Sequence, residues 1–170
     1  MKKSVQLYDA GLDEYPVSRV IAANFATALI VTTGTLACWF ISPWFGASYL
    51  AVSLAMVYIA IPRLVCRNCH YFGKRCAYGS GQLASVWFTR GRVEDFNEGA
   101  GFAVASLTYA LMILVPLIAL VLLILHAPTT TVVVLLAILL GMAFFSAGPG
   151  RRRTCSVCKM RLFCKGSAAK

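Results

Sequence analysis

Charged side chains are missing from two long stretches of this 170-residue chain. No Asp, Glu, Lys or Arg occurs in the 43 residues from Val20 to Pro62, nor in the 52 residues from Gly99 to Gly150. Charged residues make up 13% of the whole chain, against about 25% in an ordinary soluble domain. Such runs exclude a soluble catalytic domain, a coiled coil, a disordered chain and a secreted disulfide scaffold. They predict an integral membrane protein, because a membrane-spanning helix needs about 20 mostly apolar residues.

A proline divides each uncharged run into two, at Ser42-Pro43-Trp44 and at His126-Ala127-Pro128. The predicted fold is therefore all-α, with four transmembrane helices arranged as two hairpins. The expected helices span residues 17–41, 45–65, 100–126 and 129–147. Pro116 lies in the middle of the third and predicts a kink there. In the second, Ala47, Ala51 and Ala55 form a row of small side chains, which either lets another helix approach closely or reflects ordinary alanine content.

The positive charges predict how these helices are oriented. All 16 Lys and Arg residues lie before the first helix or in its first turn, in the last turn of the second helix or between the second and third, or after the fourth, and none lies in the two remaining turns. Because Lys and Arg are retained on the cytoplasmic side, we expect both termini and the middle loop to be cytoplasmic. This topology accounts for the net charge of +10 without nucleic acid as a partner. Arg151, Arg152 and Arg153 follow the fourth helix and are expected to contact anionic lipid.

Six of the seven cysteines form two triplets, each directly after a predicted hairpin. The seventh, Cys38, stands alone in the first helix. Corresponding cysteines are 89, 89 and 88 residues apart, and a glycine, Gly79 or Gly166, follows each triplet. The spacing predicts an internal repeat of a hairpin plus a cysteine segment. The first triplet, C-x2-C-x6-C, and the second, C-x2-C-x5-C, comprise Cys66, Cys69 and Cys76, and Cys155, Cys158 and Cys164.

On the cytoplasmic side these cysteines are expected to bind metal rather than form disulfides, because the compartment is reducing. Two residues between thiolates allow a tight turn that directs both sulfurs at one ion. Neighbouring basic residues are expected to lower the pKa values of the thiols and to offset their charge: Arg67, Lys74, Arg75, Lys159 and Arg161. Two segments so far apart in sequence can share an ion only if the fold brings the hairpin ends together.

The spacing of the triplets resembles that of the six-cysteine binuclear zinc cluster of fungal transcription factors. The resemblance covers about twenty residues, the second half here is one residue shorter, and two predicted membrane spans separate the halves. It implies that Cys66 and Cys155 bridge two zinc ions. It also implies terminal positions for the other four cysteines: Cys69, Cys76, Cys158 and Cys164.

The residues themselves leave several forms of the site open. The simplest is one zinc ion held by Cys66, Cys69, Cys155 and Cys158. A binuclear zinc site, an iron–sulfur cluster, a mononuclear iron and metal-free dithiol chemistry are the alternatives. His70 completes a C-x-x-C-H haem-attachment pattern, but haem of that kind is normally attached on the outer side of the membrane. His70 could replace a cysteine as a ligand, although a bond to backbone or to lipid phosphate is the default expectation.

The chain is expected to comprise four parts. Residues 1–65 carry the first hairpin, 66–99 a cysteine loop with a short amphipathic helix, 100–148 the second hairpin, and 149–170 a basic cysteine-rich tail. The absence of a catalytic constellation favours a role other than an enzyme. We expect a zinc-stabilised accessory or structural subunit of a membrane complex, in the inner membrane of a bacterium or archaeon. A redox carrier between a cytoplasmic donor and the quinone pool, and a soft-metal handling protein, are the other hypotheses.

Overall fold

The computed structural model describes residues 5–97 and 100–169. Three of the basic residues counted in the charge argument above, Lys2, Lys3 and Lys170, lie outside these ranges. Within them the chain is helical and contains no β-strand, apart from one isolated bridge between Leu12 and Cys158.

Four helical stretches are long and apolar enough to cross a membrane, as predicted. The first is α1 (Val17–Trp39), and the third is α5 (Gly101–His126). The second consists of α2 (Pro43–Ala55), the π-helical turn η1 (Met56–Ala60) and α3 (Ile61–Leu64). The fourth is α6 (Thr130–Ala147), followed by α7 (Pro149–Ser156). Pro43 and Pro149 occupy first-turn positions, where a missing N–H costs no helical hydrogen bond.

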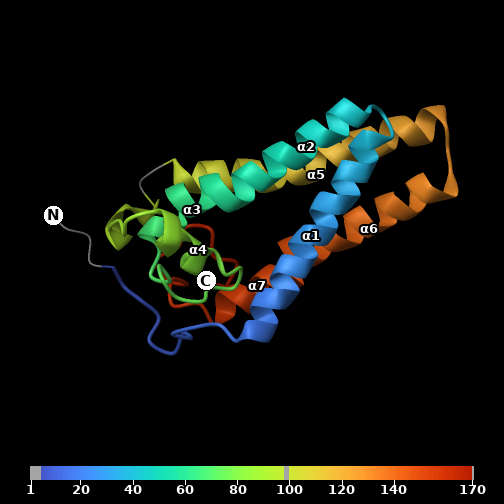
Figure 1. Ribbon diagram of the computed structural model, residues 1–170. Helices are drawn as coiled ribbons and strands as arrows, with labels where there is room; N and C mark the ends of the chain where they lie inside the picture. The colour runs from blue at the N-terminus through green and yellow to red at the C-terminus, as the bar shows by residue number, and fades with distance from the viewer. Residues whose placement is uncertain (1–4, 98–99, 170) are drawn as a thin grey trace.

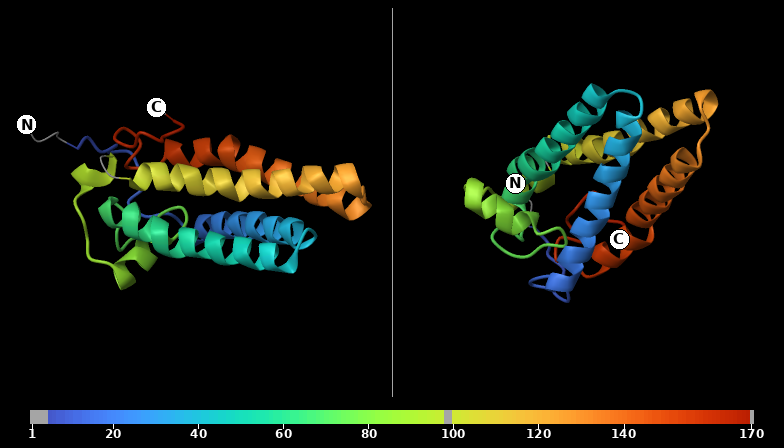
Figure 2. Two further views of the ribbon diagram at one scale, coloured as in Figure 1. Left: turned by 90° about the horizontal axis from the view of Figure 1, so that it is seen from above. Right: turned by 45° about the vertical axis from the view of Figure 1, so that its right-hand side comes forward.

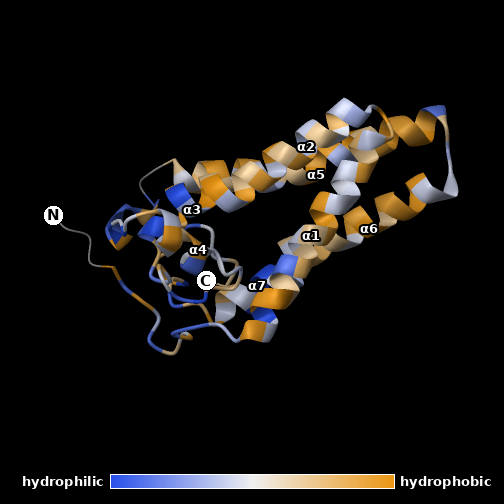
Figure 3. Cartoon of the chain, in the orientation of Figure 1, coloured by the Kyte–Doolittle hydropathy of each residue, from blue (hydrophilic) through white to orange (hydrophobic). Residues whose placement is uncertain are grey.

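These helices form two layers, with α1 beside α2 in one and α5 beside α6 in the other (Figures 1 and 2). Helix α1 also packs across α5 and α6, so it is the central helix of the bundle. Hydropathy divides the molecule along its length, with apolar helices at one end and hydrophilic segments at the other (Figure 3). We call the second region the polar end; it comprises residues 5–16, 65–97 and 149–169 and includes both described chain ends.

Tyr49 connects α2 to the core of the bundle through a hydrogen bond to α5. Pro116 has no N–H, so the carbonyl of Met112, four residues earlier in α5, loses its helical donor. The Tyr49 hydroxyl donates to that carbonyl at 2.8 Å. Gly34 of α1 makes room for the ring, because a Cβ at position 34 would collide with the Tyr49 side chain.

The predicted row of small side chains on α2 is wrong. Ala47, Ala51 and Ala55 are exposed, and the buried positions of α2 are Gly46, Tyr49 and Ser53. The contact between α2 and α1 is made instead by the large Tyr49 side chain, which occupies the space beside Gly34 of α1. Close approach is therefore achieved by one small residue on α1 rather than by a row on α2.

The π turn η1 lies directly before a second intrahelical proline. Pro62 in α3 cannot donate to the carbonyl of Tyr58, and its ring would crowd that carbonyl in a regular helix. The Ile61 N–H instead bonds the Met56 carbonyl, five residues back, which widens the turn. The helix thus continues past Pro62 and delivers the first cysteine triplet to the polar end.

Two short helical turns and one helix complete the polar end. The 3-10 turn η2 (Cys66–Asn68) begins the first triplet, and the 3-10 turn η3 (Val93–Asn97) precedes α5. Helix α4 (Ser80–Trp87) starts after Gly79, whose φ of 73° places it in the left-handed region that glycine adopts readily. This is the predicted short helix. It buries Gly81 and Ala84 and exposes Val86 and Trp87.

Candidate metal centre

Matching turns shape the two cysteine triplets. In each C-x2-C motif the second cysteine's N–H donates to the carbonyl of the first, Cys69 to Cys66 at 3.1 Å and Cys158 to Cys155 at 3.2 Å. The third cysteines also match, since the carbonyls of Cys76 and Cys164 each accept the N–H three residues later. The tight turns expected from the spacing are therefore present in both segments.

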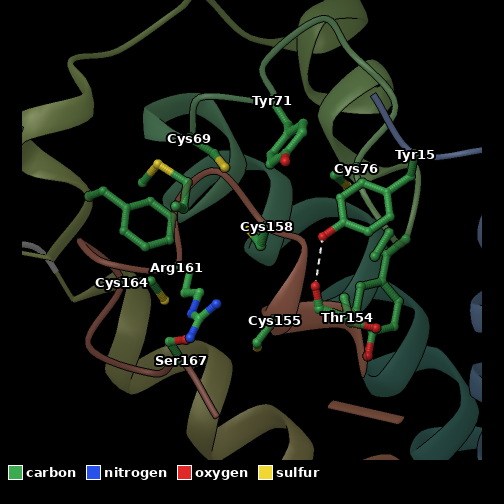
Figure 4. Close-up of a pocket in the computed structure, with 14 residues that line it drawn as sticks. Tyr15, Cys69, Tyr71, Cys76, Thr154, Cys155, Cys158, Arg161, Cys164 and Ser167 are labelled. Atoms are coloured by element: carbon green, nitrogen blue, oxygen red, sulfur yellow. Dashed lines mark hydrogen bonds between the residues drawn. The ribbon is translucent and has the colours of Figure 1, made fainter. Parts of the chain in front are cut away.

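Five of the six predicted ligands line a single cavity of about 160 Å³ (Figure 4). They are Cys69, Cys76, Cys155, Cys158 and Cys164. The first two come from the middle loop and the last three from the tail, so segments almost 90 residues apart in sequence meet at one place. Aromatic and apolar side chains supply much of the remaining wall, including Tyr15, Tyr71, Tyr78, Phe96 and Met160.

Cys66 is the exception. It does not line the cavity and is buried instead with Ile61, Ala84 and their neighbours, just after α3. The bridging position that the fungal cluster implies for Cys66 therefore has no counterpart in the cavity. No group of three His, Cys, Asp or Glu side chains placed to hold one metal ion is found among residues 5–97 and 100–169.

An N-terminal strap, residues 8–15, ties the two triplets together. Its backbone N–H groups donate to the tail at two points, Tyr8 to Lys159 and Leu12 to Val157, both at 2.9 Å. At its end, the Tyr15 N–H donates to the carbonyl of Arg75 in the middle loop, also at 2.9 Å. The strap thus bridges both cysteine segments with main-chain hydrogen bonds.

Charge pairs fix the strap further. Asp13 pairs with Lys159 and Glu14 with Arg75, each at 2.6 Å. The strap lies so close to the tail that a Cβ at Gly11 would stand 2.7 Å from the Lys159 nitrogen. Glycine is therefore required there by the close approach of two backbones. The sequence analysis did not predict this segment. The opposite charges of Asp13 and Glu14 and of the basic cysteine segments were the signal that could have indicated it.

Two buried tyrosines connect the strap to the thiols. The Tyr15 hydroxyl donates to the carbonyl of Thr154 at 2.9 Å, and the Tyr71 hydroxyl donates to the carbonyl of Leu12 at 2.7 Å. Tyr71 also accepts the N–H of Lys159 at 3.0 Å. Cys69, Cys76 and Cys158 pack against the cluster that these two tyrosines form. These tyrosines hold the position of Cys158 while presenting aromatic surface to the cavity.

The expectation that basic neighbours lower the thiol pKa values is wrong for two of the cysteines. Burial raises the pKa of the Cys69 thiol to about 12 and also raises that of Cys158. Of the five basic residues expected beside the thiols, Arg161 is the one that lines the cavity. Lys159 and Arg75 are engaged by the strap carboxylates instead. Desolvation therefore outweighs the attraction of cations at these two thiols.

His70 does not line the shared cavity. Its ring meets Tyr71 edge-on, with centroids 5.5 Å apart, and it is absent from the cavity wall. Its Nε2 is buried without a hydrogen-bond partner within the described part of the chain. Burial lowers the pKa of the imidazole, which therefore stays neutral at physiological pH. In this arrangement it is not positioned to replace a cysteine as a ligand.

The arginines expected to contact lipid lie on α7, directly after α6. Arg151, Arg152 and Arg153 are all exposed. The Arg151 guanidinium donates to the carbonyl of Gly166 at 2.6 Å, which folds the tail back toward α7. All three side chains are therefore exposed, while Arg151 also holds the tail in place.

Comparisons with protein-family models, with curated proteins and with solved structures find no match to this chain.

Proposed function

We propose that the polar end is a metal-thiolate clamp that fastens the middle loop to the tail of a multi-pass membrane protein. The observation that carries this proposal is the shared cavity, which receives Cys69 and Cys76 from one segment and Cys155, Cys158 and Cys164 from the other. A metal bound by thiolates from both sides cross-links the chain at that point. Zinc with four thiolates satisfies this proposal, as does an iron–sulfur centre.

The clamp acts on a bundle with the predicted topology, two hairpins with both termini and the middle loop in the cytoplasm. All basic residues of the described chain lie at or near the polar end, in keeping with retention of positive charge on the cytoplasmic side. The arginines of α7 and the exposed Val86 and Trp87 of α4 then form a platform at the inner leaflet. Such a platform suits an accessory or structural subunit of a larger membrane complex.

The environment of the thiols favours this role over metal-free dithiol chemistry. Nucleophilic or redox-active cysteines are thiolates with lowered pKa values. Here burial raises the pKa of Cys69 and of Cys158, so both remain protonated at neutral pH unless a metal displaces the protons. The strap over the segments also argues against rapid hand-over of metal.

Replacing Cys69 or Cys158 by Ser tests the clamp. We expect the purified protein to lose its bound metal and the 66–99 loop to become sensitive to protease, because each cysteine is drawn from a different segment. Metal content is measured by elemental analysis and loop exposure by limited proteolysis in detergent.

Cys38→Ser is the matched control. Cys38 is buried in the membrane core, far along α1 from the polar end, and its replacement should leave metal and proteolysis unchanged. Unaltered metal content in both Cys69→Ser and Cys158→Ser would refute the clamp.

A further inference from the structure

The shape of the cysteine cavity points to the class of metal centre that it holds, an inference that rests on the proposed clamp. Around one tetrahedral ion, four thiolates at about 2.3 Å from the metal lie about 3.8 Å from one another. No three candidate ligands are grouped for one ion in the described ranges. Instead, five cysteines surround a common space.

The volume of that space exceeds what a single ion needs. A protein cavity of about 150 Å³ can hold a benzene molecule, so this cavity of about 160 Å³ has room for a group of several atoms. One zinc ion would leave most of this volume to solvent unless both segments moved inward. The strap resists such a collapse, because its hydrogen bonds and ion pairs fix both segments. A centre with several metal atoms and bridging inorganic atoms would fill the space, and the thiols would remain in the cavity wall as its ligands.

The surroundings suit a polynuclear thiolate centre. The cavity wall contains aromatic and apolar side chains, and its cationic side chain is Arg161. No carboxylate or imidazole lines it, which excludes the hard-ligand sites typical of magnesium, calcium or manganese. Thiolates alone, held in a largely apolar wall, are the ligands of iron–sulfur clusters.

We propose that the cavity binds an iron–sulfur cluster through four of its five cysteine thiols, with Cys66 excluded from the ligand set. Cys69 and Cys76 supply the middle loop's two ligands, and Cys158 supplies one from the tail. These three are assigned because they line the cavity and also pack against the same buried pair, Tyr15 and Tyr71. The fourth ligand comes from Cys155 or Cys164, which both reach the cavity.

The assignment of Cys66 separates this proposal from the alternatives. A single zinc bound by the two C-x2-C pairs requires Cys66, and the fungal-type binuclear arrangement uses it as a bridge. The cluster proposed here does not, since Cys66 is buried beside Ile61 and Ala84 outside the cavity. Each model therefore predicts a different result for one substitution.

The test begins with the unmodified full-length chain, purified without oxygen in detergent and incubated with iron salts, sulfide and dithiothreitol. We expect equal amounts of iron and acid-labile sulfide and a brown colour that dithionite bleaches. Bound zinc without sulfide or visible absorption would overturn the cluster and leave the clamp standing. Absence of any bound metal would overturn both.

Single serine substitutions then identify the ligands. Cys69→Ser, Cys76→Ser and Cys158→Ser should each lose the iron and the sulfide, whereas Cys66→Ser should retain both. Loss of the cluster in Cys66→Ser, with helix content by circular dichroism and gel-filtration volume unchanged, would overturn the ligand assignment. The measurement on the unmodified chain does not depend on how any variant folds.

Discussion

The membrane bundle and the polar end are held together in different ways. In the bundle, apolar side chains fill the space between helices, and Tyr49 provides a hydrogen bond from one spanning helix to another. At the polar end, hydrogen bonds and ion pairs join the strap, the middle loop and the tail. The stability of the bundle therefore depends on how closely side chains fit between its helices. The structure of the polar end depends on contacts among three segments that are far apart in the sequence.

The largest effect on the bundle should come from Gly34→Val. The new side chain would collide with Tyr49, and overpacking of this kind costs about 1–3 kcal/mol. The expected result is earlier unfolding in a detergent titration. Gly141→Val is the matched control, because a Cβ at position 141 meets no atom within 4 Å. Equal stability of the two variants would contradict the proposed fit of the tyrosine against α1.

Tyr49→Phe should have a moderate effect, because it removes only the hydroxyl that bonds the Met112 carbonyl. Hydrogen bonds between membrane helices are worth about 0.6 kcal/mol on average, so we expect a loss of about that size. Pro116→Ala restores an N–H at position 116 that can occupy the same carbonyl. In that background the cost of Tyr49→Phe should shrink. A cost that stays the same in both backgrounds would show that the bond does not compensate for the proline.

Asp13→Asn should have the smallest effect, because the side chain is exposed. A hydrogen bond and the charge of Lys159 hold the pKa of Asp13 below its ordinary value of 3.8. A carboxyl with a lowered pKa stabilises the fold above its unfolded pKa, and the contribution disappears as pH falls through the lowered value. At neutral pH we expect slightly faster hydrogen exchange in the strap of the variant than in the unmodified protein. Added salt should make this difference smaller, because it screens the exposed ion pair. Asp9→Asn is the control. An equal change in hydrogen exchange in that variant would contradict a specific role for the Asp13–Lys159 ion pair.

The helices were predictable because the bilayer imposes a composition that is visible in one sequence. The start of α1 at Val17 and the end of α5 at His126 coincide with the prediction. Pro116 was recognised as a distortion, but its partner Tyr49 was not, since nothing local in α2 indicates which distant carbonyl lacks a donor. The alanine row failed for a related reason: small residues permit close packing but do not determine which face of a helix is buried.

At the polar end, the spacing of the cysteines predicted that the two triplets meet. It did not predict that Cys66 lies outside the shared cavity, nor which segment holds the triplets together. Five of the six share a cavity, whereas Cys66 is drawn aside by the helix that ends just before it. The strap was missed because its contacts connect residues near position 10 with residues near position 158, and a periodic pattern carries no information of that range. Burial, which reversed the expected direction of two thiol pKa values, is likewise a property of the assembled chain.

The strap also has a consequence for biosynthesis. Residues 8–15 leave the ribosome before any of the four membrane helices, whereas their partners Val157 and Lys159 follow all four. Throughout insertion of the intervening helices, the acidic segment must wait without its partners. A chain that stops before the 149–169 segment can complete its membrane helices but has nothing onto which the strap can close, so closure requires that all four helices have already been made.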